Sequence, residues 1–366
     1  MVDFSLDINE DSGRMGVFDF ENGKSFQTPN YVPSRIDFNH LERSQLIRDN
    51  DYHDIQTGEY VCWLDRNQIT MLLNDSGYYQ RTRYRISSEL RDMNVTARLL
   101  HFNFYSDVNT IDRRLLELLL ELQNDVNADI IEIPNMYAGL DYRRLIDTAL
   151  SWKEGRGVTK PLMGIACNPT DIDLLLPSVN ALDAVGLNLN RFSKPLLYHS
   201  RNTLKDQEKM IYGISAPRHY STVDKQGTLG VLINWFGVDL VSNPVLNWKA
   251  SQAFMGKISE MSEDELYQMA TNSRYFAPPD YSTHTFGYMQ EQYGEDYPLS
   301  TTCNCPICER NTIQTILDNY LETNSNSRVH QVLSYRDEAL NYRQALHNNE
   351  AEEYINSKPF IRRIID

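Results

Sequence analysis

Cys303-Asn304-Cys305-Pro306-Ile307-Cys308 is the stretch of this 366-residue sequence that says most about the fold, because it places three thiols within six residues. The next soft ligand along the chain is His330, which follows a helix predicted from about residue 311 to 321. Three thiolates and one imidazole are the ligands of a closed, structural zinc site. Iron–sulfur ligation and three unligated cysteines are the less favoured alternatives. The sequence therefore predicts a zinc subdomain held by Cys303, Cys305, Cys308 and His330.

The composition describes a folded protein without a disulfide framework. Hydrophobic residues make up 41% of the sequence, which is enough to fill the core of one large domain or two ordinary ones. The cysteines number five, and the N-terminus lacks the basic-then-apolar pattern of a secretory signal. No run approaches the roughly 18 consecutive apolar residues that a membrane span needs. We therefore expect a cytoplasmic protein without a membrane partner.

The formal net charge of −15 argues against broad, sequence-blind binding to nucleic acid, because such binding depends on many Lys and Arg contacts to phosphate. Any nucleic-acid partner must therefore meet a local basic patch. The most basic stretch is Arg81-Thr82-Arg83-Tyr84-Arg85, and Tyr78 and Tyr79 precede it. Arginines interleaved with aromatic rings could bind phosphate and stack on bases. A solvated, charged helix face is the alternative interpretation.

Short apolar runs alternate with polar, helix-like stretches from about residue 97 onward. Their spacing of roughly 25 to 30 residues suits parallel strands joined by covering helices. Strands are predicted at 97–102, 129–133, 161–166, 183–187, 210–214 and 238–241. A leucine-rich helix over residues 115–122 follows a candidate cap at Thr110. This pattern predicts an α/β fold, and a barrel fits it slightly better than an open sheet.

Residues 275–297 are rich in Tyr, Pro and polar residues without clear periodicity, and they predict a long irregular connection. We therefore expect a (β/α)8 TIM-like barrel over residues 1–275. Residues 276–366 would hold the irregular connection, the zinc subdomain and C-terminal helices.

Two motifs resemble the tRNA-guanine transglycosylase superfamily. The cysteine pattern, followed by His330 and then by Asn341-Tyr342-Arg343, resembles the zinc subdomain of that family. Far upstream, Leu73-Asn74-Asp75-Ser76-Gly77-Tyr78-Tyr79-Gln80 resembles the T-D-S-G-G-F-Q segment of the family. The resemblance implies that Asp75 acts in proton transfer, that Ser76 contacts the substrate and that Gln80 lies close by. A plain turn, with Asp and Gly supplying the bend, is the structural alternative.

Further segments follow in the same order as in the family. Thr28-Pro29-Asn30-Tyr31-Val32-Pro33 resembles its opening "TP.F.P" segment, and residues 128–135 resemble a strand that ends in an Asp reading the guanine edge. Here that last position is Asn135. Ala184-Val185-Gly186-Leu187 fits a later strand, which places Gly186 among the residues expected at the substrate.

The sequence departs from the family at the nucleophile. The family attacks C1′ with the last Asp of a G-V-D-x-F-D motif, whereas Gly237-Val238-Asp239-Leu240-Val241-Ser242 places Ser242 at that position. Serine is a poor substitute, because an alkyl glycoside does not release the sugar readily. Either Asp239 takes over, or the chemistry is lost. Strand alternation puts Asp239 on the face opposite Ser242, so a structural role for Asp239 is equally plausible.

These departures, and the weakly basic segment after Ser242, resemble the divergent DpdA-type enzymes, which are often phage-encoded and insert 7-deazaguanines into DNA. The resemblance implies exchange of guanine for a 7-deazaguanine (preQ0-like) base through a covalent glycosyl-enzyme intermediate. It favours DNA over tRNA as the substrate and, for a phage protein, the host cytoplasm as the location. A non-catalytic, zinc-stabilised companion subunit is the competing hypothesis, and a homodimer is the other protein assembly expected.

Overall fold

The computed structural model describes residues 3–10, 13–48, 51–136, 142–190, 193–217 and 231–359. The chain divides into two compact units. The first comprises Met1–Arg35, Gln56–Ala216 and Ile233–Pro244, and the second comprises Ile36–Ile55, Pro217–Leu232 and Val245–Asp366. The sequence predicted a boundary near residue 275. The division instead falls at Pro244, so residues 245–275 group with the zinc-subdomain cysteines.

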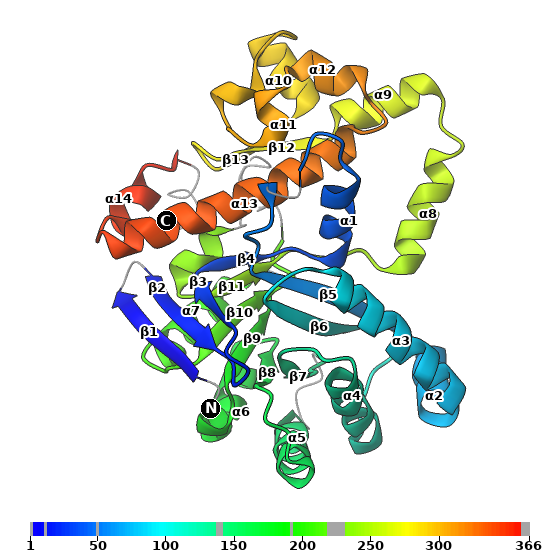
Figure 1. Ribbon diagram of the computed structural model, residues 1–366, viewed down its shortest axis with the longest axis vertical. Coiled ribbons are helices and arrows are strands. Elements are labelled where there is room, and N and C mark those ends of the chain that lie inside the picture. The colour runs from blue at the N-terminus through cyan, green and yellow to red at the C-terminus, as the bar shows by residue number, and fades with distance from the viewer. Residues whose placement is uncertain are drawn as a thin grey trace. The chain divides into compact units, whose positions relative to one another are not determined.

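Parallel strands form the centre of the first unit (Figure 1). One sheet has six strands in the order β4-β11-β10-β9-β8-β7, and β5 pairs with β6 in a second sheet. Isolated parallel bridges join Ser34 to Glu59 and Leu99 to Ile130. The strands are β4 (Asn30–Val32), β5 (Thr57–Leu64), β6 (Ala97–Phe104), β7 (Ile131–Ile133), β8 (Leu162–Ala166), β9 (Ala184–Asn188), β10 (Met210–Ile214) and β11 (Leu240–Ser242). The parallel strands predicted from residue 97 onward are confirmed as β6 to β11.

Helices follow most of these strands and pack outside them (Figure 1). They are α2 (Arg66–Asn74), α3 (Ser76–Asp92), α4 (Arg113–Asp125), α5 (Tyr142–Arg156), α6 (Pro169–Leu175) and α7 (Lys194–Leu204), with short 3-10 turns η2 (Leu176–Ala181) and η3 (Val231–Phe236). The leucine-rich helix is α4, and its buried leucines face the strands. Its N-cap is Asp112, whose side chain accepts from the Leu115 N–H, rather than Thr110.

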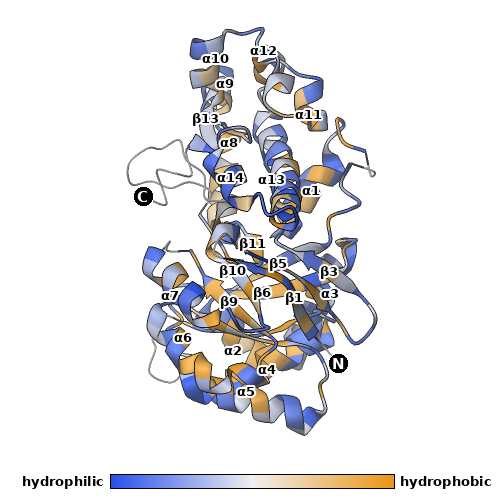
Figure 2. Cartoon of the chain, turned by 90° about the vertical axis from the view of Figure 1, so that its left-hand side faces the viewer, coloured by the Kyte–Doolittle hydropathy of each residue, from blue (hydrophilic) through white to orange (hydrophobic). Residues whose placement is uncertain are grey.

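A three-stranded antiparallel sheet covers the amino ends of the parallel strands. It consists of β1 (Asp3–Glu10), β2 (Gly13–Asp19) and β3 (Ser25–Thr28). Its phenylalanines, such as Phe18 and Phe26, share one hydrophobic cluster with Ala97, Ala184 and Met210, which are the first residues of β6, β9 and β10. Figure 2 shows the hydrophobic colour gathered on strands such as β6 and β9. Apolar side chains therefore pack between the antiparallel sheet and the parallel strands.

The second unit is mainly helical (Figure 1). It contains most of α1 (Arg35–Arg43), then α8 (Trp248–Ile258), α9 (Glu263–Thr271), β12 (Arg274–Ala277), β13 (Ser282–Thr285), α10 (Phe286–Tyr293), η4 (Leu299–Thr301), α11 (Pro306–Glu309), α12 (Ile313–Asp318), α13 (Thr323–His347) and α14 (Ala351–Asn356). None of the helices in the described ranges is long and apolar enough to cross a membrane.

Two expectations for the second unit are corrected. Residues 275–297 are not irregular, because they contain the β12–β13 hairpin and α10. Each strand of that hairpin has only four residues, which is too short to show an alternating pattern. The helix expected over residues 311–321 is the shorter α12, which begins after the Thr312 cap and ends at Asp318.

Candidate metal centre and strand-end site

The four predicted metal ligands lie together in the second unit. The Sγ atoms of Cys303, Cys305 and Cys308 and one ring nitrogen of His330 all lie within 4.8 Å of one another. His330 Nδ1 lies 3.3 Å from the Sγ atoms of Cys305 and Cys308. The cysteines lie around the short helix α11, and His330 lies on the long helix α13. The predicted cluster is confirmed as a group that could bind a metal ion.

Surrounding residues orient the imidazole of His330. Its Nε2 lies 2.7 Å from the carbonyl oxygen of Phe276, so Nε2–H donates to that oxygen and Nδ1 faces the sulfurs. The ring of Tyr275 stacks on the imidazole, with centroids 4.3 Å apart and planes 2° from parallel. The Tyr275 hydroxyl also lies 3.4 Å from Cys308 Sγ. Such outer contacts fix the tautomer and the direction of a metal-binding histidine.

The titratable groups of the cluster interact strongly, because they are buried and in contact. Burial lowers the pKa of His330, but the neighbouring Cys305 and Cys303 thiolates raise it further, and the net result is a pKa of about 10. Hydrogen bonds from Cys305 and Cys308 lower the pKa of Cys303. Negative charge therefore gathers at this buried point, and either protons or a metal ion must balance it.

Asp75 caps a helix on the surface. Its carboxylate accepts hydrogen bonds from the Gly77 and Tyr78 N–H groups at 2.8 and 3.0 Å, and it forms an ion pair with Arg81 at 3.7 Å. The whole of α2 separates Asp75 from Leu64, the last residue of β5. Asp75 therefore lies away from the carboxyl end of the strand, and its contacts are those of the turn alternative.

The other residues expected around Asp75 lie on the same exposed helix. Ser76 begins α3 and is exposed, and the exposed Gln80 accepts from Arg83. Arg83 also pairs with Asp125 at 3.4 Å. Tyr84 is 74% exposed. The basic stretch is therefore a solvent-facing helix surface that is partly neutralised by acidic neighbours.

Asp239 is a buried structural carboxylate. It is fully buried, it pairs with the buried Arg14 at 3.1 Å, and its second oxygen accepts from the Ile211 N–H at 2.7 Å. Burial raises the pKa of Asp239 to about 6 against the lowering effect of Arg14. Asp239 precedes β11, so it lies at the amino end of the strands, whereas Asp75 lies on an outer helix. The expected catalytic pair of Asp75 and Asp239 is therefore not assembled, which corrects the sequence prediction.

Two expected substrate contacts are buried in the strand layer. Ser242 ends β11, is fully buried, and its Oγ accepts from the Ser215 N–H at 3.2 Å. Gly186 lies in β9, where an added Cβ would come within 2.9 Å of Ile214 and 3.3 Å of Ile165. Gly186 therefore has a packing role between neighbouring strands, and Ser242 has a backbone-bonding role.

Asn135 lies at the carboxyl end of β7, as predicted, beside a carboxylate that the sequence prediction missed. Both N–H bonds of its amide are used, one to the Ile165 carbonyl oxygen and one to Asp171 Oδ2, each at 2.9 Å. Asp171 Oδ2 also accepts from the Cys167 N–H at 2.8 Å. Burial raises the pKa of Asp171, and these bonds partly oppose that shift. The sequence around Asp171 contains no motif that predicts its contact with Asn135, because the contact joins segments that follow two different strands.

Two further polar pairs were missed inside the strand layer. His101 Nδ1 lies 2.7 Å from Glu132 Oε2, and Tyr212 donates to Glu59 Oε2 at 2.5 Å. All four side chains are at least 97% buried. Burial lowers the pKa of His101, but Glu132 raises it further, so the net shift is upward. The only sequence signal for these pairs was the presence of a glutamate, Glu59 or Glu132, within a predominantly apolar segment.

Buried polar atoms without hydrogen-bond partners occur at the carboxyl ends of the strands. They are Trp63 Nε1 at the end of β5, Asp171 Oδ1 after β8 and Asn243 Oδ1 after β11. Each unsatisfied buried group costs about 1–3 kcal/mol, so such groups need an explanation. Parallel α/β proteins bind ligands at this end of their strands. The three atoms therefore mark a candidate ligand site.

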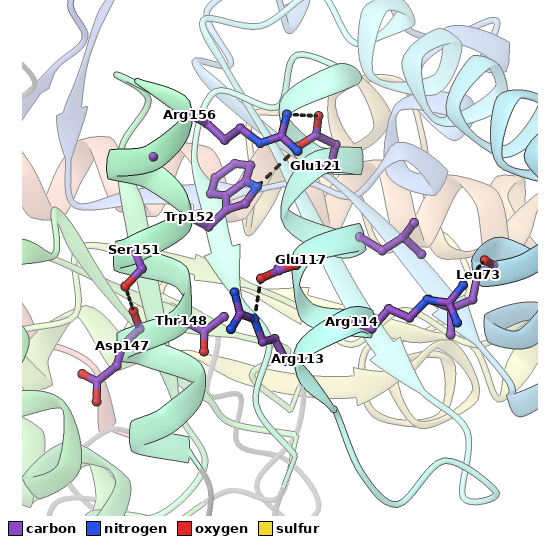
Figure 3. A pocket seen from close by; sticks show the side chains of 12 residues that line it. Leu73, Arg113, Arg114, Glu117, Glu121, Asp147, Thr148, Ser151, Trp152 and Arg156 are labelled. Atoms are coloured by element: carbon purple, nitrogen blue, oxygen red, sulfur yellow. Dashed lines mark hydrogen bonds and ion pairs between the residues drawn. The ribbon is translucent and has the colours of Figure 1, made fainter.

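A cavity of about 700 Å³ lies elsewhere, between α4 and α5 (Figure 3). Its arginines are engaged: Arg113 pairs with Glu117 at 2.7 Å, Arg156 pairs with Glu121 at 3.8 Å, and Arg114 donates to the Leu73 carbonyl. Each guanidinium of this groove therefore has an oxygen partner on a neighbouring helix or on its own helix.

Comparisons with known proteins leave the family open. No protein-family model matches the chain, and no curated protein matches it. Among solved structures, a GH53 catalytic domain from Ignisphaera aggregans is 12% identical, with 56% of this chain and 69% of that chain covered and a TM-score of 0.33. A KDPGal structure is 11% identical, with 58% and 81% covered and a TM-score of 0.31. The carboxyl transferase domain of Rhizobium etli pyruvate carboxylase is 9% identical, with 90% and 55% covered and a TM-score of 0.37. These likenesses are too weak to carry a functional argument.

Proposed function

We propose that this chain is a zinc-stabilised (β/α)8 barrel of the guanine transglycosylase type, which exchanges guanine for a 7-deazaguanine in DNA. The observation that carries the proposal is the Cys3His cluster. The resemblance requires these four residues to meet, although His330 lies 22 positions after Cys308 in the sequence. Two isolated bridges support the barrel: Ser34–Glu59 links the residues after β4 to β5, and Leu99–Ile130 links β6 to the residue before β7.

Zinc is the metal that best fits the cluster. A tetrahedral zinc ion with bonds of about 2.3 Å to sulfur and 2.0 Å to nitrogen holds these atoms about 3.5 Å apart, close to the 3.3 Å separations in this chain. With four protein ligands, the ion has no open position and would hold α11 and the hairpin against α13. We assign it a structural role, and metal analysis of the purified protein tests this.

Asp171 is the carboxylate that we assign to the base-binding site, in place of Asp75 and Asp239. Its Oδ1 and the Oδ1 of Asn135 are both acceptors, because the amide N–H groups of Asn135 are already used. Two acceptors at neighbouring strand ends complement a base edge with adjacent N–H donors, as guanine and 7-deazaguanines have. Bonds from Asn135 and the Cys167 N–H hold the carboxylate in place.

Incorporation of labelled guanine or preQ0 into DNA and tRNA tests the activity. The wild type should label DNA, Asp171→Asn should lose most of the activity, and Asp173→Asn should retain it. Asp173 is the matched control, because it lies on the same helix but is exposed and pairs with His199. Absence of label in both nucleic acids would exclude base exchange by this chain alone.

Ser242 favours a second candidate, the non-catalytic companion subunit. The position that matches the nucleophile holds a buried hydroxyl, and Asp239 is already paired with Arg14. A companion would bind nucleic acid or a catalytic homologue, or would form a dimer, without forming a glycosyl-enzyme. A stable covalent complex with a labelled oligonucleotide in denaturing gels would exclude this candidate.

A further inference from the structure

A second cavity, of about 310 Å³, lies wholly within the second unit and is independent of the proposed base exchange. It is enclosed by the end of α9, the β12–β13 hairpin and one face of α13. Amide side chains from two segments line it: Asn272 at the end of α9, and Asn324 and Gln331 on α13. Pockets of roughly 300 Å³ lie at the lower end of the size range of small-molecule sites. The cavity therefore suits a small, polar ligand.

The charge around this cavity is positive. Arg274 lines it from β12, is exposed, and has no ion-pair partner within the described ranges. Arg328 lines it from α13 and pairs with Asp37 through Nε. Among the described residues that line the cavity, none is a carboxylate. The unpaired guanidinium of Arg274 is therefore the positive charge that this cavity offers to a ligand.

The amino end of α13 adds to this positive charge. Asn324 and Ser327 lie in the first two turns of this 25-residue helix and line the cavity. No side chain caps the helix, because its N-cap residue, Glu322, makes no capping hydrogen bond. The helix dipole favours negative charge near such an end.

Thr283 provides an independent sign of a missing ligand. It is 96% buried in β13, it lines the cavity, and its Oγ1 has no hydrogen-bond partner. A buried hydroxyl without a partner destabilises a fold, so native proteins usually satisfy it. An oxygen acceptor on a ligand in the cavity would accept the hydrogen of this hydroxyl.

We propose that this cavity binds a phosphate group, held by the Arg274 guanidinium, the Thr283 hydroxyl and the side-chain amide of Asn324 in the first turn of α13. Phosphate offers several acceptor oxygens and negative charge, which match the donors that face the cavity. The volume of about 310 Å³ accommodates the phosphate group, and the sugar and base of a nucleotide would lie outside the cavity. The same chemistry could come from a free nucleotide or from a nucleic-acid strand.

Calorimetric titration of the zinc-loaded, full-length protein tests this proposal with four probes: inorganic phosphate, AMP, adenosine and a short single-stranded DNA. Phosphate and AMP should bind, and adenosine should not. Arg274→Gln should weaken phosphate binding by about tenfold or more, as expected for the loss of a charge-assisted hydrogen bond. Lys257→Gln is the matched control, because Lys257 is an exposed cation on α8 that does not line the cavity.

Thr283→Val gives the sharper result, because valine keeps the shape and removes only the hydroxyl. Phosphate affinity should fall while the melting temperature of the unliganded protein stays level or rises, since an unsatisfied buried group is lost. Tighter binding of DNA than of AMP would identify the strand as the source of the phosphate, and equal binding would identify the nucleotide. Equal affinity for AMP and adenosine, or affinities unchanged in both variants, would overturn the proposal.

Discussion

The buried pair of Arg14 and Asp239 offers a direct test of whether Asp239 is structural or chemical. The two side chains are 1% and 0% exposed and lie 3.1 Å apart. Asp239→Asn would remove the charge but keep an oxygen for the Ile211 N–H. Removing one member of a buried ion pair typically costs about 3–5 kcal/mol, because the other charge stays buried without compensation. We expect the free energy of unfolding to fall by less than that amount, because burial already disfavours the charged form of Asp239 and raises its pKa.

Arg14→Met should cost at least as much as Asp239→Asn. The Arg14 guanidinium also donates to backbone carbonyl oxygens, the shortest of these bonds being the 2.7 Å bond to Lys209. The double variant should lose less than the sum of the two single losses by about 3 kcal/mol, because neither charge remains buried alone. This difference is the coupling energy between Arg14 and Asp239, which the double-mutant cycle of wild type, two single variants and double variant measures.

Urea unfolding followed by tryptophan fluorescence measures these values, because Trp63, Trp152 and Trp235 belong to the first unit and only Trp248 lies outside it. Zinc is kept saturating so that the second unit is unchanged. If the loss of unfolding free energy in the double variant equals the sum of the two single losses, Arg14 and Asp239 do not stabilise each other. An Asp239→Asn protein with wild-type stability but no base exchange would refute the structural assignment and restore Asp239 as a chemical participant.

Three other outcomes follow from the structure. Cys305→Ser should reduce bound zinc well below one ion per chain and lower the melting temperature. Cys62→Ser removes a buried thiol outside the cluster and should keep the metal. Equal zinc content of the two variants by mass spectrometry would contradict this prediction. Burial raises the pKa of folded Asp239 from 3.8 to about 6, so the folded state binds the proton more tightly and stability should fall as pH rises from about 4 to about 6. Asp239→Asn should remove that part of the pH profile, and an unchanged profile would assign it to other groups. Tyr142→Phe should lower the free energy of unfolding by about 1–3 kcal/mol, measured by urea unfolding, because the Ile165 N–H donates to the Tyr142 hydroxyl. An unchanged free energy of unfolding would show that another acceptor replaces this hydroxyl.

The metal cluster and most of the parallel strands could be predicted from the sequence because their signals are local or periodic. Three soft ligands within six residues have few other uses in a chain that keeps its thiols free. Strands such as β8 and β10 are buried at every position, so they appear as continuous apolar runs. Strand β5 was missed because polar residues such as Glu59 interrupt its run.

The candidate site could not be predicted in the same way, because short polar motifs fit both turns and active sites. The Asp75 motif has the residues of a helix cap, and capping is what its carboxylate does. Asp171 and Asn135 are 36 residues apart, and their contact depends on β7 and β8 being neighbours in the sheet. Only the three-dimensional arrangement of the strand ends reveals that pairing.

Burial does not distinguish the two buried aspartates Asp171 and Asp239, but hydrogen-bond satisfaction does. Asp239 and Asp171 are both at least 99% buried, at opposite ends of the parallel strands. At the amino end, both oxygens of Asp239 have partners. At the carboxyl end, Asp171 has one satisfied oxygen and one without a partner. A carboxylate that the fold holds by one oxygen can accept a ligand donor with the other, and this difference supports our proposal that the base binds at the carboxyl end.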